Sequence, residues 1–475
     1  MRIYFLGICG TAMGNAALLM KSLGHEVSGA DDQVYPPMSD VLRKAGVKVR
    51  SSFDEGALAS ETPDLVVVGN AMTRGNPEVE WLLSERRTAF TSLPELLSRF
   101  ILKERNNLVI TGTHGKTTTS ALAALLLQAA GAQPGYFVGG VPRDLPRGAE
   151  LGRETDPFVI EGDEYDSAFF DKRSKFIHYL PRILVVNNIE FDHADIFRDL
   201  QDVQRTFTHL YKLVPANGWI LANSDDPNCP RAESAPWTRV ATVGTGEAAY
   251  LRIVSFRETE EGASFRLLWR GAEWGTVSWG QGGLFNARNA AMAALAAGLA
   301  LYPDDPSRLS LAPLSGYVGV KRRLEKLGEA RGITVYEDFA HHPTAVRETL
   351  RSLRNRFPQG ELWAVLEPRS NTMRTRGVQD ALVEALSAAN RVVLGEISRK
   401  HLLTPEERLD TACVTRKLAE HGIDAVAVEK NAEVLDVLER VSATPAARRV
   451  VVFFTNGSFD GVPHRYVRAL GQSEG

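Results

Sequence analysis

The sequence predicts an α/β protein made of three domains in series. Its 475 residues exceed what one ordinary hydrophobic core accommodates. Short apolar runs alternate with segments of helical periodicity, which is the rhythm of parallel sheets covered by helices. The segments 103–107 and 315–321 have the composition of linkers. We therefore expect a first domain at residues 1–104, a middle domain at 105–318 and a third domain at 319–475.

The first domain begins with βα alternation. Apolar runs at Ile3–Leu6, Glu26–Ser28 and Leu65–Val68 predict strands, and Ala16–Leu23 predicts a helix. A glycine-rich turn, GICGTAMG, follows the first strand, and Asp31 ends the second. The pattern is typical of dinucleotide-binding domains, but its G-x-x-G-x-x-x-G spacing departs from the G-x-G-x-x-G of NAD enzymes. This spacing weakens the NAD dehydrogenase interpretation, and an ordinary tight turn is the other alternative.

The middle domain opens with a strand, a glycine turn and a helix. Leu108–Thr111 predicts the strand and Ala121–Ala130 the helix, and further strands are expected at Phe158–Ile160 and Ile183–Val186. Three runs of alternating residues, YLRIVSFR, SFRLLW and WGTVSW, indicate antiparallel strands added to the sheet. The remaining expected elements are a helix at Asn289–Ala300 and third-domain strands at Ile333–Tyr336, Leu362–Leu366, Val392–Leu394 and Val450–Phe454.

The sharpest local pattern is TGTHGKTTT at residues 111–119, between a strand and a helix. Gly112 and Gly115 allow the backbone to wrap a phosphate, and the helix N-terminus adds free N–H groups and a positive dipole end. Lys116 can reach the β- and γ-phosphates, and the Thr117 hydroxyl can hold Mg²⁺. The spacing is G-x-x-G-K-T rather than G-x-x-x-x-G-K-[ST]. The loop predicts binding of ATP or GTP, and the alternative is a glycine turn with a surface lysine.

Two further polar groups follow strands of the same sheet. Glu161 follows the strand FVI in EGDEYD, and His193 follows the strand ILVV in NNIEFDHAD. Both should lie at the carboxyl edge of the sheet, beside the phosphate loop. With Thr117 they can complete the ligand shell of a Mg²⁺ ion. The alternatives are a helix-capping acid for Glu161 and a hydrogen-bonded loop histidine for His193.

Composition limits the possible partners and the compartment. Lys and Arg number 55 against 58 Asp and Glu, a formal net charge of -3, which gives no electrostatic footprint for nucleic acid. Three scattered cysteines, without a CxxC pair, fit a reducing compartment and neither a disulfide framework nor a zinc site. No secretory signal is recognised, and no run is expected to approach the ~18 apolar residues of a membrane helix. We expect a cytoplasmic protein that contacts no membrane; the oligomeric state is open and compatible with a monomer.

Several segments together resemble the Mur ligase family. GTHGKTT resembles its ATP loop, EGDEYD its EADE segment, NNIEFDHAD its N-x-E-x-DH segment and DFAHHP its D-x-x-H-H-P segment. Members are three-domain enzymes that form peptide bonds through an acyl phosphate. The resemblance, which spans nearly the whole chain, implies a Rossmann-like first domain that binds a UDP-sugar. It also implies a P-loop ATPase-type middle domain with added antiparallel strands and a Rossmann-like, peptide-binding third domain.

The resemblance implies roles for residues around ATP and Mg²⁺. The family's H-N-x-x-N motif appears with Phe285 in place of its histidine, and helix capping is the alternative for Asn286. Thr117, Glu161 and His193 would bind Mg²⁺, with Glu161 rather than Asp163 or Glu164 as the matching acid. The implied ATP-binding residues are Gly112, Thr113, His114, Gly115, Lys116, Thr117, Thr118, Asn286, Asn289, Arg323, Asp338 and His342, and the implied catalytic residues are Lys116, His193, Arg323, Asp338 and His341.

The implied substrate sites lie in the first and third domains. The glycine turn would meet the pyrophosphate of a UDP-sugar and Asp31 its uridine. LEPRSNTM at 366–373 follows a third-domain strand, where an arginine fork and small polar groups suit a peptide with several carboxylates. A structural salt bridge is the alternative for that arginine. The implied substrate-binding residues are Gly7, Gly10, Thr11, Met13, Gly14, Asp31, Asn70, Thr73, Asn76, Arg369, Ser370, Asn371 and Thr372.

The resemblance is strongest to one branch of the family. No lysine occurs between His193 and Tyr211, unlike relatives with a carbamylated lysine, and this matches the branch whose substrate carries a free lactyl carboxylate. Six stretches, YPPMS, GNAMTRGNPE, AFFDKRSKF, EFDHADIF, DFAHHPTA and LEPRSNTM, resemble one member of this branch. They imply a ligase that joins L-Ala-γ-D-Glu-meso-diaminopimelate to UDP-N-acetylmuramate in peptidoglycan recycling. A UDP-N-acetylmuramate–L-alanine ligase is the nearest alternative. A P-loop kinase and a non-enzymatic UDP-sugar sensor with an ATP switch are the others.

Overall fold

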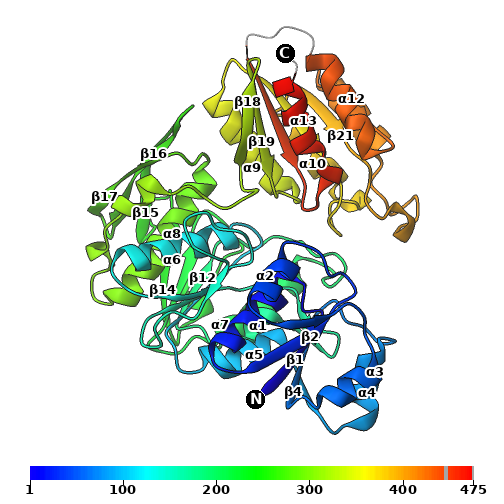
Figure 1. Ribbon diagram of the computed structural model, residues 1–475. Coiled ribbons are helices and arrows are strands. Elements are labelled where there is room, and N and C mark those ends of the chain that lie inside the picture. Colours follow the sequence, from blue (N-terminus) through cyan, green and yellow to red (C-terminus); the bar gives the residue numbers. More distant parts are fainter. Residues whose placement is uncertain (443–447, 473–475) are drawn as a thin grey trace.

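A computed structural model describes residues 1–442 and 448–472 of the chain. It contains three α/β units, each with its own main sheet, in chain order (Figure 1). The N-terminal unit lies at the bottom right of the view, the middle unit at the left and the C-terminal unit at the top. This architecture confirms the predicted fold class, whereas the boundaries after residues 104 and 318 remain predictions.

The first sheet has five parallel strands in the order β3-β2-β1-β4-β5. Its strands are short and apolar because helices cover both faces. The order reverses between β1 and β4, so the glycine turn after β1 opens at the switch point where ligands bind in such sheets. The elements are β1 Arg2–Leu6, α1 Thr11–Ser22, β2 Glu26–Ala30, α2 Met38–Lys44, β3 Lys48–Arg50, α3 Glu55–Glu61, β4 Leu65–Val68, α4 Pro77–Glu85, β5 Ala89–Ser92, α5 Leu93–Leu97 and a π-helical turn, Ser98–Leu102.

The middle sheet has ten strands in the order β17-β16-β15-β14-β13-β12-β6-β9-β7-β8. The strands around β6 run parallel, and the three predicted added strands, β15 to β17, pair antiparallel with one another. Its elements are β6 Asn107–Thr111, α6 Lys116–Ala129, β7 Gly135–Phe137, β8 Ala149–Glu150, β9 Phe158–Glu161, β12 Ile183–Val186, α7 Leu200–Tyr211, β13 Trp219–Asn223, β14 Arg239–Gly244, β15 Leu251–Thr259, β16 Gly262–Trp269, β17 Ala272–Trp279 and α8 Leu284–Leu301, with a separate hairpin of β10 Asp166–Ala168 and β11 Asp171–Ser174.

Several elements begin earlier than the sequence predicts. Helices α1, α6 and α8 extend into the polar or glycine-rich segments before their apolar stretches, where hydrophobic periodicity gives no signal. The predicted linker 103–107 is wrong at its last residue. Asn107 is buried at the start of β6, and its side-chain amide donates to the carbonyl oxygens of Leu102, Tyr179 and Leu180.

Helix α8 also corrects the expectation about long apolar segments. Its 18 residues are long and apolar enough for a membrane span by length and composition. However, 72% of this helix is buried inside the structure. It packs beside α6, and its alanines lie in the core of the middle domain. We therefore interpret α8 as a core helix.

The third sheet has six strands in the order β18-β19-β23-β20-β21-β22, all parallel except the edge strand β18. The carboxyl ends of β19 and β20 carry the two segments that the sequence assigned to ligands. The elements are β18 Glu325–Ala330, β19 Ile333–Asp338, α9 Pro343–Arg356, β20 Glu361–Leu366, α10 Gln379–Leu386, β21 Arg391–Leu394, α11 Thr411–Glu420, β22 Asp424–Ala427, α12 Asn431–Ser442, β23 Arg449–Phe454 and α13 Val462–Gln472.

The added strands of the middle domain reach the third domain. On β15, Oε1 of Glu258 accepts hydrogen bonds from the hydroxyl of Ser352 over 2.6 Å and from the backbone N–H of Gly283 over 2.6 Å. Its Oε2 accepts from the side-chain amide of Asn355 over 3.0 Å. Ser352 and Asn355 belong to α9, so one carboxylate joins β15, the start of α8 and α9.

Candidate active site

A cavity of about 710 Å³ lies between the middle and third domains. Ligand sites commonly form at such domain interfaces. Loops from the carboxyl edge of the middle sheet form one wall, and the segment after β19 forms the other. The cavity brings together these sequence-predicted residues: Thr113, His114, Gly115, Lys116, Thr118, Glu161, His193, Asn286, Asn289, Arg323, Asp338 and His341.

The phosphate loop has the backbone geometry that its glycines permit. Gly112 and Gly115 have φ of 129° and 83°, values that other residues rarely adopt. A Cβ on Gly112 would lie 2.9 Å from Cβ of Asn187, and one on Gly115 would lie 2.4 Å from Oδ1 of Asn289. Helix α6 starts directly afterwards at Lys116, so its N-terminal N–H groups are available to an anion.

A residue that the sequence analysis missed, Asn188, holds this loop in place. Its Oδ1 accepts from the backbone N–H of His114 over 2.7 Å, and its Nδ2 donates to the His114 carbonyl over 3.2 Å. The backbone N–H of Thr113 donates to the Asn188 carbonyl. The available signal was the pair of asparagines directly after a buried strand in NNIEFDHAD.

Lys116 and His193 meet at an acid that the sequence analysis passed over. Nζ of Lys116 donates to Oε2 of Glu164 over 2.7 Å, and Nε2 of His193 lies 3.3 Å from Oε1 of the same residue. Burial opposes the charge on Lys116, but Glu164 and Asp163 outweigh burial and raise the lysine pKa. Burial also lowers the pKa of His193, but contact with Glu164 raises it by more. The net shift of the His193 pKa is therefore upward. The acidic segment 161–164 therefore keeps a cationic lysine beside the loop.

Glu161 contacts Thr117, the residue that follows Lys116. The Thr117 hydroxyl donates to Oε1 of Glu161 over 2.9 Å, and Nη2 of Arg323 lies 3.4 Å from the Thr117 oxygen. The side chains of Asp163, Glu164 and His193 offer ligand atoms within 4.8 Å of one another. Oε1 of Glu164 is buried, and Nε2 of His193 lies 3.3 Å from it. Carboxylate and hydroxyl oxygens are the donors that Mg²⁺ prefers, so these groups fit such an ion.

The polar residues of the segment after β19 each have different hydrogen-bond partners. Both carboxylate oxygens of Asp338 accept backbone hydrogen bonds, from Leu324 and Ala340, and burial raises its pKa. His341 places Nδ1 2.9 Å from the Phe339 carbonyl oxygen, and its Nε2 lies 3.7 Å from Oδ2 of Asp192. His342 is the N-cap of α9, where Nδ1 accepts from the Thr344 N–H. The Asp338 carboxylate thus supports the turn as well as lining the cavity.

The LEPRSNTM loop contributes to domain contact. The Thr372 hydroxyl is buried and donates to Oδ1 of Asp192 over 2.6 Å, across the interface with the middle domain. The Ser370 hydroxyl donates to the His341 carbonyl over 3.0 Å. Arg369 is 41% exposed at its side chain and lies 3.5 Å from Glu367. All four residues assigned to a peptide therefore have partners within the protein, because Oδ1 of Asn371 also accepts from Nη2 of Arg374.

The same loop leads to an arginine that the sequence analysis did not single out. Arg374 is only 8% exposed, and burial lowers its pKa. Nη2 donates to Oδ1 of Asn371 over 2.9 Å, whereas Nε and Nη1 lack hydrogen-bond partners among the described residues. A buried guanidinium with free donors is suited to a carboxylate ligand. The burial of Arg374 could not be predicted from the sequence, because arginine usually lies at the surface.

The two asparagines of FNARN line the cavity and also support the loop. Nδ2 of Asn286 donates to the Gly282 carbonyl over 2.7 Å. The Thr119 hydroxyl of α6 donates to Oδ1 of Asn289 over 3.2 Å. Asn286 lies inside α8 rather than at its N-cap, which is Gly283. The amides therefore hold the start of α8 and join it to α6.

The first domain places its predicted residues around the turn after β1. Gly10 is the N-cap of α1, and Thr11 is its first residue. Asp31 is buried, and its carboxylate accepts from the backbone N–H groups of Cys9 and Gln33. A Cβ on Gly14 would lie 2.4 Å from the sulfur of Met38, so a larger residue here would displace the Met38 side chain. Of the others, Gly7 has a φ of 81°, Met13 is buried, Asn70 is half-buried, Thr73 is exposed and Asn76 caps α4.

Comparison with known proteins identifies the family. The Mur ligase family catalytic domain matches residues 2–105, the Mur ligase middle domain matches 110–297, and the Mur ligase glutamate ligase domain matches 322–457. The chain is 41% identical, over 99% of both chains, to the UDP-N-acetylmuramate–L-alanyl-γ-D-glutamyl-meso-2,6-diaminoheptandioate ligase of Escherichia coli K12. It is 34% identical to the UDP-N-acetylmuramate–L-alanine ligase of Arthrobacter, over 83% of this chain and 81% of the other.

A solved structure gives the same result. The chain is similar to the crystal structure of a murein peptide ligase from Psychrobacter arcticus, with 34% identity, a TM-score of 0.70 and 99% coverage of both chains. The ATP loop, the adjoining acidic segment and the three α/β domains agree with this similarity. The chain therefore belongs to the Mur ligase family, whose members are ATP-dependent ligases that form C–N bonds.

Proposed function

We propose that this protein joins the tripeptide L-Ala-γ-D-Glu-meso-diaminopimelate to UDP-N-acetylmuramate, with ATP and Mg²⁺, in the cytoplasm. The observation that carries the proposal is the 41% identity to a ligase of that name over 99% of both chains. Two donor nitrogens of the buried Arg374 lack partners in the described part of the chain, which supports an acceptor richer in carboxylates than alanine. Peptidoglycan recycling is the process that this reaction would serve.

The cavity supports a reaction in two displacements. A lactyl carboxylate oxygen of UDP-N-acetylmuramate attacks the γ-phosphorus of ATP, and ADP leaves. The neutral peptide α-amine then attacks the acyl carbon, and inorganic phosphate leaves with the amine's proton as the amide bond forms. Lys116 and Arg323 would neutralise negative charge on the transferred phosphoryl group. The protein's contribution is chiefly to position the reactants and exclude water.

The Mg²⁺ ion would bind between the phosphate loop and the acids beside it. Thr117, Glu161 and His193 are the proposed ligands, and Glu164 lies between His193 and Lys116 as a further carboxylate. When bound, Mg²⁺ would screen the phosphate oxygens. The UDP-sugar would bind to the first domain, residues 1–104. ATP would bind to the middle domain, residues 105–318, and the peptide to the third domain, residues 319–475.

Phosphate release measured with UDP-N-acetylmuramate and ATP tests the assignment. The expected result is release that depends on an added amine, with the tripeptide a far better acceptor than L-alanine. Efficient use of L-alanine would instead favour the alanine ligase. Phosphoryl transfer without amide formation would indicate a kinase, and nucleotide binding without turnover would indicate a sensor.

A further inference from the structure

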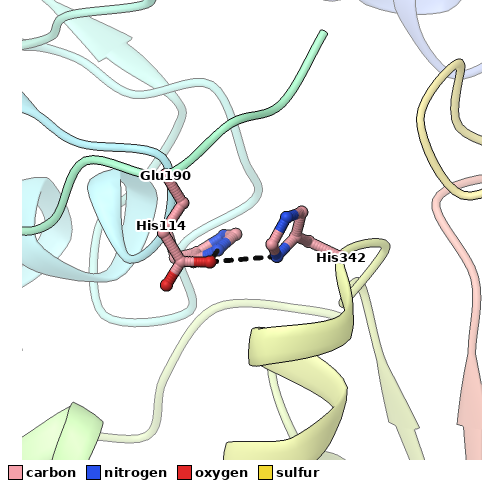
Figure 2. Close-up of side chains that lie close together, drawn as sticks. All are labelled: His114, Glu190 and His342. Carbon is pink, nitrogen blue, oxygen red and sulfur yellow. Dashed lines mark ion pairs between the residues drawn. The ribbon is translucent and has the colours of Figure 1, made fainter. Parts of the chain in front are cut away.

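Three side chains that could hold a metal ion meet where the middle and third domains touch. His114 comes from the phosphate loop, Glu190 from the segment after β12, and His342 from the start of α9. In Figure 2 the three side chains point toward one another. Oε2 of Glu190 lies 3.6 Å from Nε2 of His114 and 3.2 Å from Nδ1 of His342. This cluster is separate from Asp163, Glu164 and His193.

The hydrogen bonds of His342 determine which of its nitrogens carries a lone pair. Nε2 lies 3.2 Å from the Phe191 carbonyl oxygen, which can only accept, so Nε2 carries the proton. Nδ1 accepts from the Thr344 N–H over 3.3 Å, which agrees with this tautomer. Nδ1 therefore carries its single lone pair, which accepts from the Thr344 N–H, and a metal ion on Nδ1 would replace that hydrogen bond. Nδ1 and Oε2 of Glu190 are two acceptors that lie 3.2 Å apart, a contact that a bound cation would make favourable.

The spacing and the donor types suit a transition-metal ion. With metal–ligand distances of about 2.0–2.2 Å, tetrahedral ligand atoms lie roughly 3.3–3.5 Å apart. The two measured separations, 3.6 and 3.2 Å, bracket this range, and all three donor atoms lie within 4.8 Å of one another. Nε2 of His114 is buried without a hydrogen-bond partner among the described residues. Two imidazoles and a carboxylate favour zinc-class ions over Mg²⁺.

We propose that His114, Glu190 and His342 form a binding site for a divalent transition-metal ion of the zinc class. The Phe191 carbonyl holds the second nitrogen of His342, as backbone carbonyls commonly do for metal-bound histidines. Three protein ligands leave a tetrahedral position for water or a substrate oxygen. Because two ligands belong to the middle domain and one to α9, the ion ties the phosphate loop to the third domain.

Titration of the full-length protein with Co²⁺ in excess Mg²⁺ tests the site. One ion should bind the wild type and give the visible bands of Co²⁺ in a low-coordination nitrogen and oxygen site. His342→Gln and His114→Gln should each weaken binding by at least about 100-fold, because even outer-sphere losses cost about 10- to 100-fold. Circular dichroism checks folding, and Glu190→Gln provides a third, more conservative variant.

Two histidine variants serve as matched controls. His341→Gln removes the histidine adjacent to His342, which lies near Asp192 instead, and should leave the Co²⁺ bands unchanged. His193→Gln removes the histidine of the other cluster and should also leave them unchanged. Bands that survive in all three cluster variants would overturn the proposal. So would bands lost only in His193→Gln, or a wild type that binds no Co²⁺.

Discussion

Nζ of Lys116 donates a hydrogen bond to Oε2 of Glu164 over 2.7 Å, so the lysine of the ATP loop has a carboxylate partner within the protein. His193 contacts the other oxygen of the same carboxylate. An ATP phosphate bound at the proposed site must therefore share Lys116 with Glu164 or displace it. The phosphate loop and the acidic segment 161–164 consequently act as one electrostatic unit.

Lys116→Ala should reduce ligation by at least about 100-fold, the scale for removing one group that stabilises transition-state charge. Binding of UDP-N-acetylmuramate, measured by calorimetry, should change little because that ligand is assigned to the first domain. Parallel loss of both would show that the first domain is not an independent UDP site.

His193→Ala should raise the Mg²⁺ concentration needed for half-maximal activity before it affects UDP-sugar affinity. Removing one ligand weakens a metal site whose oxygen donors remain. The measurement is a Mg²⁺ titration of the ligation rate for mutant and wild type. Superimposable titrations would exclude His193 from the metal shell.

Thr372→Val should lower the rate with every acceptor alike. The substitution keeps the side-chain shape but removes the hydrogen bond to Asp192 and leaves a buried carboxylate with one donor fewer. Such a loss costs about 1–3 kcal/mol and should disfavour the closed domain arrangement. Acyl-phosphate trapping and acceptor kinetics provide the two readouts. A defect confined to the tripeptide KM would instead return Thr372 to the peptide site.

Arg374→Gln should selectively damage use of the tripeptide. A charge-assisted contact to a carboxylate contributes on the order of 2–3 kcal/mol, which corresponds to roughly 30- to 150-fold in kcat/KM. Arg369→Ala, the substitution that the sequence favours, is the matched comparison and should have an effect of the same kind if both arginines bind peptide. Equal loss of acyl-phosphate formation would assign the affected arginine to the ATP site.

Stability should fall as the pH drops below about 6.5, partly through His178. Its side chain is 8% exposed and lies 3.0 Å from Asp171; burial and Arg173 lower its pKa. The unfolded chain therefore binds a proton at a higher pH than the folded chain, and unfolding becomes easier on acidification, by at most about 1.4 kcal/mol per pH unit. Chemical denaturation across pH should show a shallower slope for His178→Gln. An identical slope would exclude this histidine.

The sequence predicted most of the fold because apolar periodicity and glycine turns are local signals. Gly112 and Gly115 belong to this class, since their backbone angles restrict the residue type wherever the chain folds. Glu164 was passed over because three acids stand within four residues, and spacing alone does not decide which one faces Lys116. The contact made by Thr372 was not predicted for a different reason: its partner Asp192 is 180 residues away, and such a contact leaves no local pattern.

The carboxylate of Glu258 has a mechanical consequence. Because it binds Ser352 and Asn355, the third domain is attached to the middle domain at α9 as well as through the connecting chain. Rotation that widens the cavity can keep this attachment only if it pivots near β15. The added antiparallel strands would then act as the hinge between the two domains. Shortening β15 and β16 should loosen the attachment of the third domain and leave the residues of the proposed nucleotide site unchanged.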